Sequence, residues 1–122
     1  MEFKVNPKVQ IGHIHLTVSD IERSLKFYRD LLGFEITTYY GDSAVFLSAG
    51  GYHHHLGLRP SNKRQNQDSI GLVWYTIELP NTSTVQELVN RLQASGVDVT
   101  QNGNGYHFHD HANNGIRLYS PD

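Results

Sequence analysis

Apolar and polar residues alternate along several short segments of the chain, beginning with residues 11–18. A period of two is typical of a strand with one buried face. Between residues 19 and 33 the period changes: Ile21, Leu25, Tyr28 and Leu32 recur at helical spacing. Three more segments of strand type follow, at 34–40, 44–48 and 52–58, separated by Gly-Asp and Gly-Gly turns. The first half therefore predicts a strand, a helix and three strands.

The ends of the first helix carry their own signals. Ser19, followed three residues later by Glu22, predicts a capping box at its start. Gly33 follows the last apolar position, where a glycine commonly ends a helix.

The same order of elements recurs in the second half. Strands are predicted at 72–79, 97–100, 106–110 and 116–120, with a helix at 82–95. Gly33 maps onto Gly96 at an offset of 63, and the last strands map at a similar offset. We therefore expect one α+β domain over residues 1–122, with module one at about 11–58, a polar connector at 59–71 and module two at about 72–120. Two tandem βαβββ modules predict a curved, mostly antiparallel sheet with the helices outside and a concave pocket.

The amino-acid composition argues against several classes of function. The 122 residues include ten Lys and Arg against twelve Asp and Glu, which argues against a nucleic-acid partner. The absence of cysteine excludes disulfides, thiolate nucleophiles and zinc sites built on sulfur. No apolar run approaches the ~20 residues of a membrane span, and the first ten residues carry no apolar signal segment. We expect a cytoplasmic protein without a membrane partner.

The histidines are the residues that indicate a possible functional site. The eight histidines fall into three groups: His13 and His15; His53, His54 and His55; His107, His109 and His111. If each group lies on a strand, alternate side chains share a face. One interpretation is that each pair is a polar filler on a half-exposed strand. Three such groups together favour a shared polar or metal-lined cavity.

Three stretches of the sequence are similar to motifs of a known family. Residues 12–34 (GHIHLTVSDIERSLKFYRDLLGF) resemble the opening of the vicinal oxygen chelate superfamily. This superfamily contains glyoxalase I, extradiol catechol dioxygenases, and fosfomycin- and bleomycin-resistance proteins. Residues 51–58 resemble the fourth strand of the first module in dioxygenase-like members, and 110–119 resemble the closing D-P-x-G-N-x-I-E-L-Y element. The resemblance implies a single-domain member with the fold predicted above.

The resemblance also implies metal ligands. His13 matches the ligand position of the first strand, and His55 matches that of the last strand of module one. His107 lies at a position that faces the pocket in fosfomycin-resistance-like members, and His15 is an alternative ligand. These imidazoles suit Fe(II), Mn(II), Ni(II) or Zn(II). The predicted metal site is therefore His13, His55 and His107.

Module two departs from the family pattern. Trp74 aligns with a position that is usually His, and Arg117 with one that is usually Glu. Trp cannot ligate a metal, and a guanidinium repels a cation. If a metal is retained, Arg117 is expected to bind a substrate carboxylate or oxyanion. Glu78 is the nearest candidate carboxylate, although it lies four residues further along than Trp74.

Three functions remain open at this stage, and no catalytic residue is assigned. The first is a metal-dependent lyase or dioxygenase that acts on a small oxygen-chelating substrate. The second is a metal-free protein of the bleomycin-resistance kind that binds an aromatic or acidic ligand. The third is a partner domain, such as the non-catalytic half of a two-domain dioxygenase. The expected ligand-binding residues are Arg117, Trp74, His15, His53 and Tyr119, and the resemblance implies a homodimer.

Overall fold

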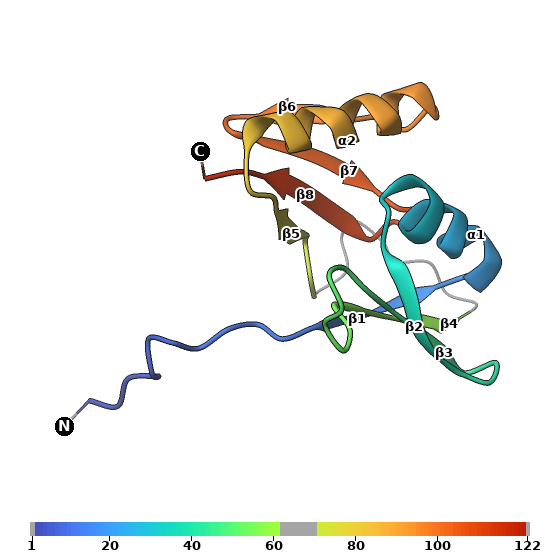
Figure 1. Cartoon of the computed structure of the whole chain (residues 1–122), viewed down its shortest axis with the longest axis horizontal. Helices are drawn as coiled ribbons and strands as arrows, with labels where there is room; N and C mark the ends of the chain where they lie inside the picture. The colour runs from blue at the N-terminus through green and yellow to red at the C-terminus, as the bar shows by residue number, and fades with distance from the viewer. Residues whose placement is uncertain (1, 62–70, 122) are drawn as a thin grey trace.

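The predicted order of elements is confirmed by a computed structural model that describes residues 2–61 and 71–121 (Figure 1). Most of the predicted connector, residues 62–70, lies outside the described residues. The first module contains β1 (Ile14–Val18), α1 (Ile21–Leu25), η1 (Lys26–Leu31), β2 (Glu35–Tyr40), β3 (Ala44–Ser48) and β4 (Leu56–Pro60). The second contains β5 (Tyr75–Glu78), α2 (Thr82–Ala94), β6 (Thr100–Asn102), β7 (Gly105–His109) and β8 (Gly115–Tyr119).

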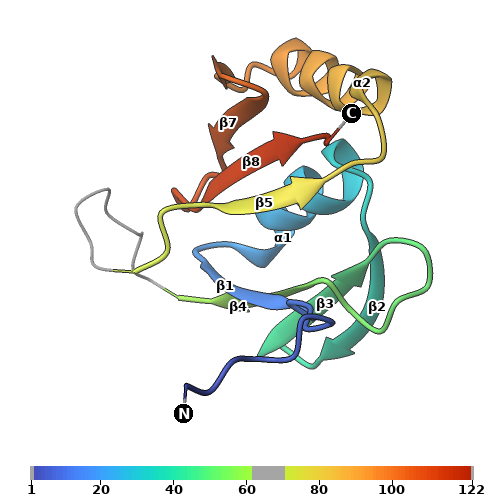
Figure 2. The same cartoon turned by 90° about the vertical axis from the view of Figure 1, so that its left-hand side faces the viewer.

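Each module builds its own mixed sheet. Within the described residues the strand orders are β1-β4-β3-β2 and β5-β8-β7-β6. β1 pairs in parallel with β4, and β5 pairs in parallel with β8, whereas the remaining pairs are antiparallel. In Figure 2 the two sheets lie one above the other, with β1 and β5 at their facing edges and α1 behind them. The α+β fold of two βαβββ modules therefore takes the form of two four-stranded sheets.

The first helix begins one residue later than the capping-box pattern predicts. Asp20, not Ser19, is the N-cap residue, and its Oδ1 accepts a hydrogen bond from the backbone N–H of Arg23 at 3.2 Å. After Leu25 the helix widens into the π-helical turn η1, which ends before Gly33. Gly33 has a φ of +94°, a conformation that glycine adopts without a steric penalty.

The histidine run of module one lies in a loop, where the sequence predicted a strand over residues 52–58. Gly50 and Gly51 both have positive φ values, 68° and 79°, and turn the chain after β3. β4 begins only at Leu56. The alternation of side chains that placed His53 and His55 on one face therefore does not apply there.

Regular alternation does hold on β1 and β8. Leu16 and Val18 point into the core, as do Ile116 and Leu118. The intervening residues of these strands, including Arg117, point to the opposite face. The helices lie on the core side, so no helix of the described residues covers this opposite face of the two sheets, which faces the viewer in Figure 2.

A buried carboxylate connects the two modules. Asp110, in the turn after β7, accepts a hydrogen bond from the Tyr28 hydroxyl at 2.7 Å. Asp110 also accepts three hydrogen bonds from N–H groups, two from the backbones of Ala112 and Asn114 and one from the Asn114 side chain, at 2.8–2.9 Å. The Asn114 side chain donates in addition to the carbonyl of Thr17 on β1 at 3.0 Å. This network fixes the β7–β8 turn against the first module.

Candidate functional site

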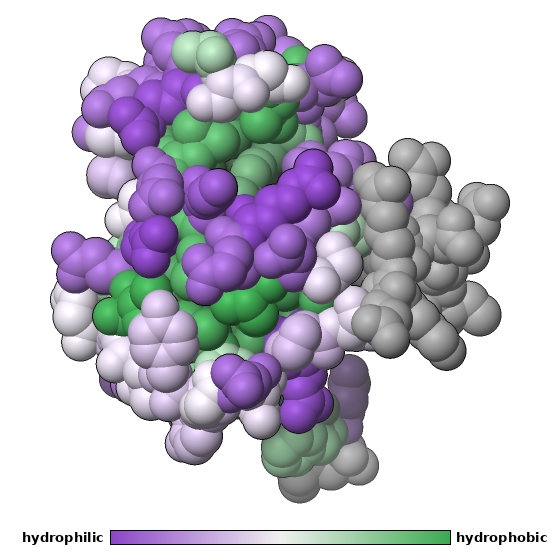
Figure 3. Space-filling view, turned by 90° about the vertical axis from the view of Figure 1, so that its right-hand side faces the viewer, coloured by the Kyte–Doolittle hydropathy of each residue, from purple (hydrophilic) through white to green (hydrophobic). Residues whose placement is uncertain are grey.

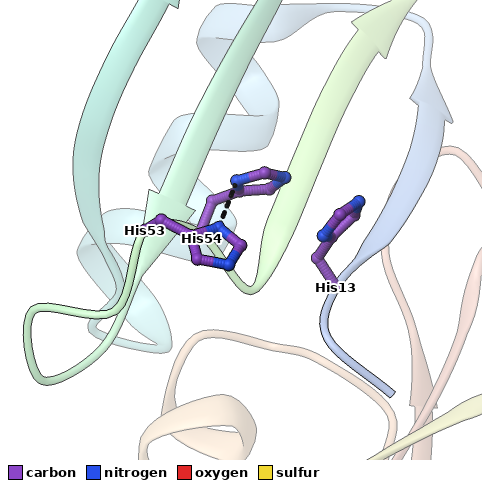
Figure 4. Close-up of side chains that lie close together, drawn as sticks. All are labelled: His13, His53 and His54. Carbon is purple, nitrogen blue, oxygen red and sulfur yellow. Dashed lines mark hydrogen bonds between the residues drawn. The ribbon is translucent and has the colours of Figure 1, made fainter. Parts of the chain in front are cut away.

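Three imidazoles meet on the open face of the first sheet. Each of His13, His53 and His54 offers one ring nitrogen, and these three atoms all lie within 4.8 Å of one another. The ring of His13 lies 4.2 Å from that of His54 and 6.0 Å from that of His53, measured between centroids. Figure 4 shows that His13 approaches from the segment before β1, whereas His53 and His54 come from the loop before β4.

His54 has a nitrogen available for a ligand. Its Nδ1 lies 3.1 Å from Nδ1 of His53, whereas its Nε2 is buried and has no hydrogen-bond partner in the described part of the chain. The ring stacks on Phe46 at 4.5 Å with an interplanar angle of 14°. Burial lowers the pKa of His54, and the neighbouring histidines, His13 first, lower it further. The neutral form that this favours is the form that binds metals.

His15 stands next to this group. Its ring centroid is 5.0 Å from that of His13 and 5.6 Å from that of His54. It lies over Gly57 of β4, where an added Cβ would come within 2.8 Å of the ring. The glycine therefore provides the space that the His15 ring occupies.

His55 points elsewhere. Its Nδ1 accepts the backbone N–H of Ala49 at 3.2 Å, and its ring lies 4.5 Å from that of Tyr52 and 6.3 Å from that of Phe34. The structure thus brings His13 together with His53 and His54, and places His55 beside a different set of aromatic rings.

A cavity of about 660 Å³ lies between the two modules. Its lining includes His13 and Ile14 at the start of β1, Leu56 of β4, Phe34 after η1, and residues 75–79 of the second module. His55 and Glu78 also line it, together with a majority of apolar side chains. His13 consequently belongs both to the histidine group and to the wall of this cavity.

The other predicted site residues lie on the second sheet. His107 of β7 contacts the Trp74 ring edge to face, with centroids 4.9 Å apart. Burial lowers the pKa of His107, followed by the charge of Arg117 and the effect of His109. The Arg117 guanidinium lies 4.7 Å from the centroid of the Tyr119 ring.

A second cleft, of about 760 Å³, lies on the helical side of the molecule between α1, η1, the end of α2 and the β7–β8 turn. Its lining includes His109 and His111 together with Arg23, Lys26 and Phe27. Figure 3 views this side and shows apolar surface between polar residues.

The sequence alone did not point to His54, because strand alternation would have turned it away from His53 and His55. The available signal was the uninterrupted run of three histidines directly after two glycines, which marks a loop in which neighbouring side chains need not alternate.

The chain belongs to the Glyoxalase/Bleomycin resistance protein/Dioxygenase superfamily, whose family model matches residues 10–118. This confirms the resemblance to the vicinal oxygen chelate proteins.

Two curated relatives are dioxygenases by name. The chain is 41% identical over 105 residues to the catechol-2,3-dioxygenase of Bacillus subtilis (strain 168), covering 82% of this chain and 37% of that protein. It is 37% identical over 92 residues to the manganese-dependent 2,3-dihydroxybiphenyl 1,2-dioxygenase of Geobacillus genomosp. 3, covering 74% of this chain and 27% of that protein. The chain thus spans about a third of the length of these relatives.

Solved structures share the fold. A fosfomycin resistance protein, FosX, from Listeria monocytogenes superposes with a TM-score of 0.75 at 18% identity, covering 93% of this chain and 91% of that one. A lactoylglutathione lyase from Agrobacterium tumefaciens gives a TM-score of 0.73 at 20% identity, with 95% and 96% covered. In the described part of this chain, no helix has the length and apolar character needed to cross a membrane.

Proposed function

We propose that this chain binds a divalent metal ion through His13, His53 and His54, and that it binds there a small ligand bearing two adjacent oxygen atoms. The proposal rests mainly on His13. This residue belongs to the group formed with His53 and His54, and it also lines the apolar cavity between the modules. An ion on His13 would therefore lie beside a space large enough for a small aromatic ligand.

The donor set fits such an ion. Three imidazole nitrogens within 4.8 Å of one another leave open positions for water or a ligand, as catalytic metal sites do. The unpartnered Nε2 of His54 supplies a buried acceptor with no competing hydrogen bond in the described residues. Stacking on Phe46 holds the His54 ring in place. When bound, the ion would act as a Lewis acid toward the ligand oxygens.

Relatives favour a hard or borderline ion. One relative is manganese-dependent by name, and one FosX structure is complexed with Mn(II). Imidazole ligands are also compatible with iron, nickel and zinc. Mn(II), Fe(II), Ni(II) and Zn(II) are therefore the ions to test.

The test is elemental analysis of protein purified without chelators or nickel affinity resin, followed by add-back of these four ions. The proposal predicts close to one equivalent of one metal per chain. It also predicts that catechol, which has two adjacent oxygens, binds the metal-loaded protein more tightly than phenol. No bound metal and no thermal shift with any of the four ions would contradict it.

A metal-free binding protein is the second candidate function. It is favoured by the positions of Trp74 and Arg117, which stand where the family resemblance places ligands in metal-dependent members. In that case the second sheet, which carries Arg117, would bind aromatic ligands equally well in the presence of a chelator.

A further inference from the structure

The second sheet carries a cationic side chain, Arg117, that packs closely against two neighbouring residues. Arg117 projects from β8 on the face away from the helices, and its guanidinium lies over Gly105 of the neighbouring strand. A Cβ added to Gly105 would lie 2.3 Å from the Arg117 Nε and 2.5 Å from its Cζ. The Cζ atom is also 4.7 Å from the centroid of the Tyr119 ring. Because Gly105 has no side chain, the guanidinium packs directly on its backbone, with the Tyr119 ring beside it.

The donors of this guanidinium are not used within the described part of the chain. The Arg117 side chain makes no hydrogen bond and no ion pair with any described residue; the ion pair found among those residues joins Arg29 and Asp30. Glu78 lies on the adjacent strand, in register with Tyr119, and does not pair with Arg117. Five N–H groups in a planar fork are therefore available to an acceptor from outside the chain.

The surroundings suit an aromatic anion. His107 lies opposite Arg117 in the β7–β8 register, and the Trp74 and His107 rings meet edge to face with their centroids 4.9 Å apart. Because burial and the charge of Arg117 lower the pKa of His107, a neutral imidazole stands beside the cation. The Trp74 side chain is 45% exposed and offers an aromatic plane to a ligand.

We propose that Arg117, which packs on Gly105 and Tyr119 and lies opposite His107, binds the carboxylate group of an aromatic acid. The planar fork matches a carboxylate with two parallel hydrogen bonds, and Trp74 packs against the ring of the same ligand. This site needs no metal: it rests on the second candidate function, a metal-free binding protein, and gives that function a specific site and ligand class.

Trp74 makes the site directly measurable, because it is the single tryptophan of the chain. The experiment is a titration of the full chain with benzoate in the presence of EDTA, followed by tryptophan fluorescence. Benzyl alcohol serves as the neutral control ligand of similar size. The proposal predicts a saturable change with benzoate and binding at least about tenfold weaker with benzyl alcohol.

Three variants assign the binding to this geometry. Arg117→Gln removes the positive charge, whereas Arg117→Lys keeps the charge but loses the planar guanidinium fork. Both variants should bind benzoate more weakly, and Arg117→Gln should lose at least about tenfold in affinity. Gly105→Ala places a methyl group where the guanidinium lies and should weaken binding as well. Arg59→Gln is the matched control, because it removes an exposed arginine from β4 of the other sheet.

Circular dichroism of each variant establishes that it is folded. Equal affinity for benzoate and benzyl alcohol, unchanged affinity in Arg117→Gln, or no fluorescence response to benzoate would each overturn the proposal. Because EDTA is present throughout, none of these outcomes depends on a metal at the histidine group.

Discussion

Replacing Tyr28 by Phe removes one hydroxyl group from the network that joins the two modules. The Tyr28 hydroxyl donates to a carboxylate oxygen of Asp110 at 2.7 Å, and both side chains are buried. A hydrogen bond to a charged group contributes about 1.5–3 kcal/mol to stability. Asp110 keeps its three N–H donors in the variant, so we expect a loss of about 2 kcal/mol in the free energy of unfolding.

The assay is equilibrium unfolding in urea. With an m value of about 1.5 kcal/mol/M, a loss of about 2 kcal/mol lowers the midpoint by about 1.3 M while leaving m unchanged. Tyr106→Phe is the control: Tyr106 is a half-buried tyrosine on β7 whose hydroxyl makes no hydrogen bond with the described residues. A loss below about 0.5 kcal/mol in Tyr28→Phe, equal to that of the control, would refute the assignment of this hydrogen bond as a link between the modules.

Tyr75→Phe should change the free energy of unfolding by less than about 1 kcal/mol in the same urea assay, because the buried Tyr75 hydroxyl makes no short hydrogen bond and interacts weakly with the neighbouring Tyr28 hydroxyl; a loss above about 1 kcal/mol would contradict this. Burial raises the pKa of both Tyr28 and Tyr75, so the unfolded chain releases these protons first. Stability should therefore fall by about 2 kcal/mol between pH 10 and 11, with both tyrosines contributing, and the slope should approach about 2.7 kcal/mol per pH unit at higher pH. A flat stability profile between pH 10 and 11 would exclude this. Gly57→Ala should displace the His15 ring, visible as shifted His15 signals in an NMR spectrum, because the new Cβ would lie 2.8 Å from it; unchanged signals would show that the contact is absent.

Much of the fold could be predicted from hydrophobic periodicity. The helix at 82–95 and the strand at 44–48 were predicted to within one residue, because each has a regular pattern between clear turn signals. The N-cap of the first helix was placed one residue early, since Ser19 and Asp20 are both good capping residues and periodicity does not distinguish them.

The candidate site could be predicted only in part. His13 was named from the family resemblance, and the structure places it in the histidine group. Its neighbours depend on how the chain turns after Gly50 and Gly51, because this turn delays β4 until Leu56. Loop conformation of this kind follows from tertiary contacts such as the stacking of His54 on Phe46, which no local pattern encodes.

Calorimetric titration of metal ions into matched variants tests the central claim most directly. The variants are His54→Ala and His55→Ala, two adjacent histidines of which only His54 belongs to the group with His13 and His53. Mn(II) and Zn(II) are the titrants, and the chain is first stripped with a chelator that is then removed. We predict that the unmodified chain binds close to one equivalent, that His54→Ala weakens binding by more than about 100-fold, and that His55→Ala changes it by less than about threefold. Full affinity in His54→Ala, or a loss confined to His55→Ala, would contradict the proposed metal site.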